Sequence, residues 1–170
     1  LHTMVRPAEA AGIRWEEIDL DARVWTIPPE RMKTGKSHTV PLSSQAITIL
    51  NTMRPISGHR DYVFPSSRKP NEAVNSQTAN MALKRMGFKG TLVSHGLRAL
   101  ASTTLNEQQF DSDIIESALA HIDKNTIRAA YNRAEYLEQR RVMMQWWSDH
   151  IEQAEAGKTQ SEKGFKHLRV

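Results

Sequence analysis

Three short strand patterns lie close together in the first quarter of the chain, and they constrain the fold more than any other feature. They are centred on Ile18, Val24–Ile27 and Thr39–Leu42. The connections between them are short turns, which join antiparallel neighbours rather than parallel ones. Gly35 suits the tight bend of the second connection, and Pro41 indicates an edge strand or a strand end. The sequence therefore predicts a small three-stranded antiparallel sheet.

Most of the remaining chain has helical periodicity, with apolar residues at spacings of three and four. Several segments also contain a residue that is suited to begin or end a helix. The predicted helices are 8–15, Ser43 (as N-cap) to Met53, Asn75 to Met86 with Gly87 as the stop, Ser94 (as N-cap) to about Gln109, a helix opened by Asp111 or Ser112, and about Glu135 to Ala156. The expected fold class is mainly α with a small three-stranded antiparallel β-sheet.

The composition limits the class of protein. With 170 residues, 39% of them hydrophobic, and a mean hydropathy of −0.57, the chain is long enough to bury one core. No apolar run approaches the roughly 18 residues that a membrane helix needs, and we expect no signal peptide. Cysteine is absent, which excludes disulfides and thiolate chemistry and fits a reducing compartment. The net charge of +4 indicates a mild preference for polyanions.

Two boundaries are predicted from local patterns. Leu1–Met4 has the pattern of a helix end, so we expect an N-terminally truncated fragment of a longer protein. Residues 1–156 are predicted to form one domain. Residues 157–170 are polar and charged, and we expect them to be a mobile tail.

Two arginines are candidates for binding a phosphate group. Arg6 precedes Pro7 and so lies at the predicted start of a helix, a place that favours anions. Arg98 follows His95 at a spacing of three, which puts both side chains on one helix face. A guanidinium stays protonated and its planar fork matches two phosphate oxygens. The commoner role of a surface arginine is a salt bridge, and we assign that role to Arg14, Arg85 and Arg128, while Arg133 could contact DNA or pair with an acid.

A histidine and a tyrosine lie on either side of a predicted helix break. His121 precedes the break at residues 123–125, and Tyr131 is predicted to lie on a new short helix beyond it. A phenol has a pKa near 10, so nucleophilic attack at neutral pH needs a base or strong stabilisation of the product. The alternatives are Tyr136, five residues further on, and Tyr62, which the sequence indicates is a packing residue.

The remaining candidates handle protons. His95 and His121 can donate hydrogen bonds to the phosphate oxygens or share a proton with the tyrosine. Lys33 and Lys36, both in the turn around Gly35, can each act as a general acid. The other histidines are interpreted as structural: His2, His38, His59, His150 and His167. The sequence has no metal-ligand motif and no nucleotide-binding loop, so we expect no metal and no cofactor.

These residues, taken in order, resemble the catalytic domain of the tyrosine recombinases, the phage integrase family, and most closely the integrases of bacterial prophages and genomic islands. The resemblance extends from the first residue to about Ile151. The family pattern is an arginine with an acid three residues later, a hairpin lysine, His-x-x-Arg, Leu-x-His and a tyrosine nucleophile. The matching positions are Arg6 with Glu9, Lys33, His95 with Arg98, Leu119–Ala120–His121, and Tyr131.

The resemblance implies a site-specific recombinase that cleaves and rejoins DNA through a 3′-phosphotyrosyl link, for integration and excision of a mobile element. It favours Tyr131 over Tyr136 as the nucleophile and Lys33 over Lys36 as the general acid, and it suggests that Glu9 orients Arg6. It also implies double-stranded DNA with specific sites as the partner, a homotetramer on DNA, accessory DNA-bending or directionality proteins, and a cytoplasmic location on the nucleoid.

Two other functions fit parts of the same pattern. A type IB topoisomerase uses a similar set of residues but relaxes supercoils as a monomer, without paired sites. A catalytically inactive DNA-binding module would need none of these residue types. All of the expected catalytic residue types are present, which favours an enzyme.

Overall fold

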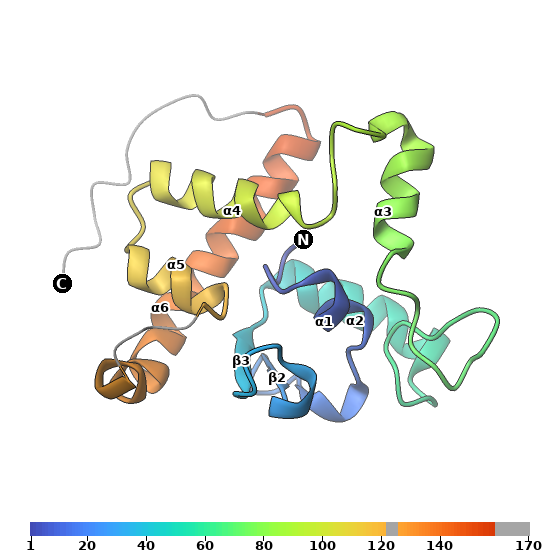
Figure 1. Cartoon of the computed structure of the whole chain (residues 1–170), viewed down its shortest axis with the longest axis horizontal. Helices are drawn as coiled ribbons and strands as arrows, with labels where there is room; N and C mark the ends of the chain where they lie inside the picture. Colours follow the sequence, from blue (N-terminus) through green and yellow to red (C-terminus); the bar gives the residue numbers. More distant parts are fainter. Residues whose placement is uncertain (122–125, 159–170) are drawn as a thin grey trace.

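The computed structural model describes residues 1–121 and 126–158, and for residues 126–135 it describes the backbone alone. Helices make up most of these residues, and one three-stranded antiparallel sheet lies near the N-terminal end of the chain (Figure 1). The predicted fold class is confirmed.

The N-terminal part of the chain contains the sheet and several short helical turns. Its elements are α1 (Pro7–Ala11), η1 (Trp15–Glu17), β1 (Ile18–Asp19), β2 (Val24–Ile27), η2 (Pro29–Arg31) and β3 (His38–Pro41). The strands are ordered β1-β2-β3, and Trp25 pairs with Ile18 on one side and Val40 on the other. Along β2, Trp25 and Ile27 are buried and Thr26 is exposed, which is the alternation expected of a sheet with one buried face.

The helical part follows the sheet in the sequence, and its last helix packs against β3. Its elements are α2 (Ser44–Ser57), α3 (Thr78–Leu83), η3 (Lys84–Phe88), α4 (Gly96–Glu107), α5 (Ser112–Ala118) and α6 (Thr126–Glu155). Helix α6 contacts both α5 and β3, and Met143, Met144 and Trp147 place its buried face in the common core. None of the helices in the described part of the chain is long and apolar enough to cross a membrane.

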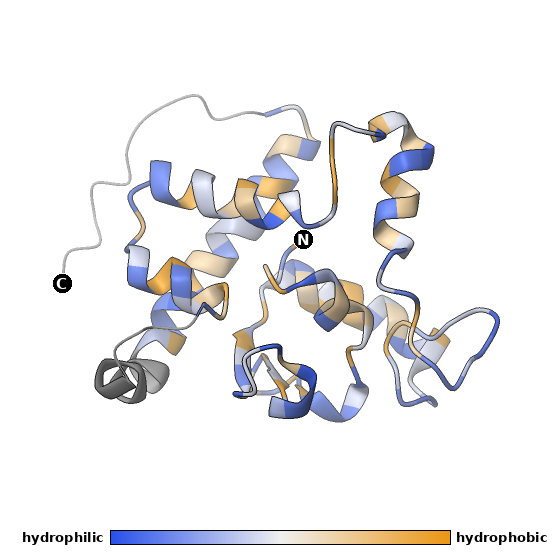
Figure 2. Ribbon diagram, viewed as in Figure 1, coloured by the Kyte–Doolittle hydropathy of each residue, from blue (hydrophilic) through white to orange (hydrophobic). Residues whose placement is uncertain are grey.

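The short helix α3 lies at one side of the molecule, away from the longer helices α4 and α6 (Figure 1). Apolar residues nevertheless occur along it (Figure 2). Met81 is 44% exposed and Met86 is 69% exposed. The apolar positions in this segment therefore do not all enter the core.

Several local predictions are confirmed at helix ends and turns. The Ser43 hydroxyl accepts a hydrogen bond from the Ala46 N–H at 3.3 Å, which makes it the N-cap of α2. Asp111 caps α5 by accepting from the Asp113 N–H at 2.8 Å. Gly35 has a φ of 64°, a left-handed backbone conformation that glycine adopts readily. These features depend only on neighbouring residues, so the sequence predicts them well.

The prediction of two separate helices after residue 125 is wrong. Helix α6 is continuous from Thr126 to Glu155, so Tyr131 does not lie on a short helix of its own. The sequence contains neither proline nor glycine between these ends, and nothing local stops the helix. The predicted break at residues 123–125 lies outside the described residues, as does most of the predicted tail.

Other helix ends differ from the prediction by a few residues. Helix α1 stops at Ala11 and a separate turn, η1, follows. Helix α2 continues through Pro55 to Ser57, whose buried hydroxyl donates to the Val63 carbonyl oxygen at 2.7 Å. Residues 1–4 form a turn rather than a helix end, with a φ of 53° at Met4.

The predicted N-cap at Ser94 is also wrong. Helix α4 begins one residue later than expected, with His95 as its N-cap, because a turn closed by the Gly96 N–H and the Val93 carbonyl at 2.9 Å precedes it. The Ser94 hydroxyl is buried and has no hydrogen-bond partner among the described residues.

Candidate active site

Arg6 is fixed at the N-terminal end of α1 by Glu9. The Glu9 carboxylate accepts from the Arg6 backbone N–H at 2.7 Å and from its guanidinium Nη1 at 2.9 Å. The Glu9 side chain is 4% exposed and that of Arg6 is 24% exposed. A buried carboxylate with two bonds to one residue restricts the arginine to one orientation, so Arg6 presents its remaining N–H groups in a defined direction.

Arg98 lies deeper in the protein, on α4. It is buried, and its Nη2 donates to the Leu119 carbonyl oxygen at 2.8 Å, at the C-terminal end of α5. Burial and the nearby charge of Arg6 lower the pKa of Arg98, and Glu9 opposes this effect. The structure therefore brings Arg6 and Arg98 into electrostatic contact, although 92 residues separate them in sequence.

His121 directly follows the turn to which Arg98 is bonded. Its backbone N–H donates to the Glu116 carbonyl oxygen at 3.1 Å, and its Nδ1 lies 2.5 Å from the Glu116 carboxylate. The preceding residue, Ala120, has a φ of 51°. The imidazole is half exposed. With Nδ1 engaged by a carboxylate, Nε2 is the nitrogen left to face a substrate.

His95 and Lys33 are exposed. His95 is the N-cap of α4, three residues before the buried Arg98, and the shared face of the two side chains stays a prediction. Lys33 lies in the connection between β2 and β3, two residues after η2 ends.

The proposed nucleophile is placed only by its backbone. Tyr131 lies in the first turns of α6, and its side chain is outside the described residues, as are those of Arg128 and Arg133. The rival Tyr136 is half-buried on the same helix. Tyr62, the predicted packing tyrosine, accepts a hydrogen bond from Arg14 at 3.3 Å, and Arg14 also pairs with Glu16 as expected.

Two groups that the sequence did not indicate lie beside the arginines. His38, at the start of β3, is half-buried, and desolvation together with the charges of Arg140, Arg98 and Arg6 lowers its pKa to about 4. A hydrogen bond to the Ala118 backbone partly offsets these effects. Arg140 on α6 is 4% exposed, and burial lowers its pKa to about 10. The sequence around His38 does not indicate that arginines distant in the chain lie near it.

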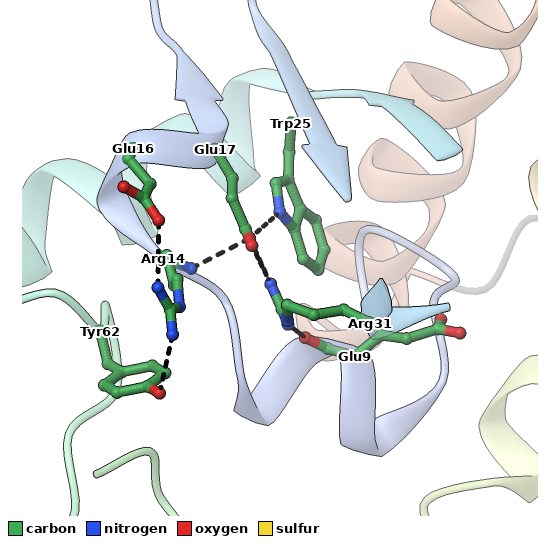
Figure 3. Close-up of polar contacts among 7 residues, drawn as sticks. All are labelled: Glu9, Arg14, Glu16, Glu17, Trp25, Arg31 and Tyr62. Carbon is green, nitrogen blue, oxygen red and sulfur yellow. Dashed lines mark hydrogen bonds and ion pairs between the residues drawn. The ribbon is translucent and has the colours of Figure 1, made fainter. Parts of the chain in front are cut away.

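A third unpredicted feature is a buried ion pair between Glu17 and Arg31. It lies beneath α1, close to Glu9 and Trp25 (Figure 3). Among the described residues, no group of three or more histidine, cysteine or acidic side chains could hold a metal ion. The described part of the site is built from cations, histidines and two orienting carboxylates, Glu9 beside Arg6 and Glu116 beside His121.

Residues 1–138 match the phage integrase family in sequence. The chain belongs to this family. It is 60% identical over 157 residues to prophage integrase IntA of Escherichia coli, with 92% of this chain and 38% of IntA covered. It is 42% identical over 156 residues to prophage integrase IntZ of Escherichia coli, with 91% of this chain and 38% of IntZ covered.

The fold comparison agrees. The structure resembles that of the integrase from mycobacterium phage Brujita with a TM-score of 0.63 at 22% identity, covering 85% of this chain and 47% of the other. At this identity the likeness concerns the fold alone. The integrase-family chain spans well under half the length of both prophage relatives, so it corresponds to only a part of each.

Proposed function

We propose that residues 1–156 form the catalytic domain of a site-specific DNA integrase, which cleaves and rejoins DNA strands through a 3′-phosphotyrosyl intermediate. The observation that carries the proposal is the arrangement of Arg6 and Arg98. Their guanidinium groups act on each other electrostatically, one is held by a buried carboxylate and the other by the turn that leads to His121. Two fixed forks of this kind suit the nonbridging oxygens of a phosphodiester.

The reaction uses the residues in separate roles. The Tyr131 phenol oxygen attacks phosphorus, the bond from phosphorus to the 5′-oxygen breaks, and the phenol proton passes to His95 or His121. Lys33 gives a proton to the 5′-oxygen, which leaves as a hydroxyl group. Arg6 and Arg98 stabilise the charge on the nonbridging oxygens. Attack by a 5′-hydroxyl on the phosphotyrosine reverses these steps and rejoins the strand without ATP.

The names of the relatives support this proposal, because IntA and IntZ are both described as prophage integrases. The partner is double-stranded DNA with specific recombination sites. On that DNA we infer a homotetramer, with accessory DNA-bending or directionality proteins, acting in the cytoplasm. Residues 157–170 are proposed to be a tail outside the catalytic domain.

The test is capture of the covalent intermediate. The DNA probe is a nicked suicide duplex that carries the sequence repeated at the two ends of the integrated element. Mass spectrometry of the DNA–peptide adduct should place the nucleotide on Tyr131. Tyr131→Phe should bind the duplex and form no adduct, because it lacks the attacking oxygen. Tyr136→Phe is the matched control and should form the adduct normally.

The outcomes separate the proposal from its alternatives. An adduct on Tyr136, or normal adduct formation by Tyr131→Phe, would overturn the assignment of the nucleophile. Binding without any adduct in the unmodified protein would identify an inactive DNA-binding module. Relaxation of supercoiled plasmid that lacks recombination sites would indicate a topoisomerase.

A further inference from the structure

A network of polar contacts centred on Glu17 links Arg14, Trp25 and Arg31 and reaches Glu9 of α1 (Figure 3). The Glu17 carboxylate accepts from the Arg31 guanidinium with both oxygens, from the Trp25 indole N–H at 2.9 Å and from the Arg14 backbone N–H at 3.1 Å. The Arg31 Nη2 donates to the Glu9 carbonyl oxygen at 2.8 Å. We call these contacts the Glu17 network.

The protein is built to accommodate Arg31 in this position. The Glu17 side chain is 5% exposed and that of Arg31 is 19% exposed. A Cβ on Gly12 would come within 2.9 Å of the Arg31 Nη2, a distance shorter than van der Waals contact. A glycine at position 12 therefore leaves room for the guanidinium against the end of α1. The ion pair is not a surface contact, which would contribute little.

The Glu17 network joins two parts of the candidate site that are distant in sequence. Arg31 is the last residue of η2, and Lys33 follows two residues later in the exposed part of the β2–β3 connection. Met32, between them, is buried. On the other side, Arg31 bonds the backbone of Glu9, whose carboxylate holds Arg6. The Arg31–Glu9 hydrogen bond therefore connects the base of the Lys33 segment to α1, and the Glu9 carboxylate continues the connection to Arg6.

We propose that Arg31 is a positioning residue for DNA cleavage, which sets the distance between the proton donor Lys33 and the phosphate bound by Arg6. The inference rests on the proposed function. The phosphate is fixed by α1, whereas the proton must reach the 5′-oxygen from a separate connection. Only a defined contact between the two elements keeps the lysine ammonium and the leaving oxygen in register, and proton transfer requires hydrogen-bond distance.

An arginine is required here for geometric reasons. Arg31 uses Nη1 for the Glu17 carboxylate and Nη2 for the Glu9 carbonyl at the same time. A lysine has a single nitrogen and no planar fork, so it cannot reproduce both contacts in these directions. Arg31→Lys therefore keeps the charge and most of the volume while it removes the link.

The experiment compares two DNA substrates. In one the scissile 5′-oxygen is normal, and in the other it is replaced by sulfur, which leaves without needing a proton. Arg31→Lys should slow cleavage of the normal substrate by about 10²-fold, the scale expected for a small displacement of a catalytic group. On the sulfur substrate, the cleavage rate of Arg31→Lys should return to within a few-fold of the rate of the unmodified protein. Glu17→Gln, which weakens the hold on Arg31 from the other side, should give the same pattern.

Two controls accompany these variants. Arg14→Lys changes a neighbouring arginine whose side chain contacts Glu16 and Tyr62 instead, and it should cleave both substrates at nearly the unmodified rate. Thermal unfolding of each variant shows that the domain is folded. A loss caused only by poorer folding would slow both substrates equally, and that result would overturn the inference.

The failure of the inference differs from the failure of the proposed function. Lys33→Ala is measured with the same pair of substrates. Rescue of Lys33→Ala by sulfur without rescue of Arg31→Lys would overturn the positioning role alone. Absence of rescue in Lys33→Ala would remove the lysine as the acid, and the inference with it. If Arg31→Lys cleaves both substrates as fast as the unmodified protein does, the inference is likewise overturned.

Discussion

The two halves of the candidate site are held in different ways. Arg6 and Arg98 are fixed before any DNA is present, by a buried carboxylate and a backbone carbonyl. Lys33, His95 and His121 are exposed, and of these three His121 has a side-chain contact described, to Glu116. The difference matches the proposed chemistry, because charge stabilisation is most effective when the dipoles need no reorganisation. Groups that exchange protons with a large substrate must instead be reachable before it covers them.

The largest expected effect comes from the exposed half. Lys33→Ala should slow cleavage of normal DNA by about 10² to 10⁴-fold, the range for loss of a general acid. Because Lys33 is exposed, thermal stability should change little. The measurement is adduct formation on the normal and bridging-sulfur substrates, with Lys36→Ala as the matched control from the same turn. If sulfur rescues Lys36→Ala instead, the proton donor is the neighbouring lysine.

The buried half should respond differently. Arg98→Ala should slow cleavage by about 10² to 10³-fold, as for loss of one donor to a developing charge. Sulfur at the leaving position should not rescue it, because the nonbridging charge is unchanged. Arg98→Lys should remain slow, since it lacks the fork that bonds Leu119 and a phosphate together.

A binding measurement sharpens this contrast. A preformed arginine pair should bind free sulfate, and binding at ten times Kd adds about 1.4 kcal/mol to the free energy of unfolding. The free energy of unfolding of Arg98→Ala should not rise by this amount when sulfate is added, whereas that of Lys33→Ala should. Sulfate also stabilises folded proteins in general, so the difference between the two variants is the quantity to compare. Equal responses would show that the arginine pair is not preformed.

The parts of the molecule that were predicted correctly depend on nearby residues. Ser43, Asp111 and Gly35 act within three residues of their own positions, and the alternation in β2 requires only its own four residues. The order of the candidate catalytic residues was likewise visible from the family pattern. Local chemistry and a family motif therefore account for the elements and the list of candidates.

The parts that were missed depend on contacts distant in sequence. Arg98 bonds Leu119 across 21 positions and Arg31 bonds Glu9 across 22, and neither contact follows from any periodicity. The sequence indicates only a structural role for His38, because its charged neighbours come from the N-cap of α1, from α4 and from α6. The partners of a buried charge are set by packing, which the sequence does not reveal residue by residue.

The smallest expected effect concerns His38, which lies beside the buried half of the site. Its pKa is lowered from 6.5 to about 4 by burial and by the charges of Arg140, Arg98 and Arg6. The folded protein therefore holds this imidazole neutral at pH 5, where the unfolded chain protonates it. The unfolded state binds more protons between about pH 6.5 and pH 4, so stability falls as the pH is lowered through that window.

The size of this effect follows from the two pKa values. Between pH 7.5 and pH 5, His38 should account for about 2 kcal/mol of lost unfolding free energy. Urea unfolding at both pH values measures the total loss, to which other groups also contribute. His38→Gln should show a smaller loss than the unmodified protein, because glutamine does not titrate. An equal loss in His38→Gln would mean that the arginines do not hold the imidazole neutral, and that the fixed half of the site is more open to water than its contacts indicate.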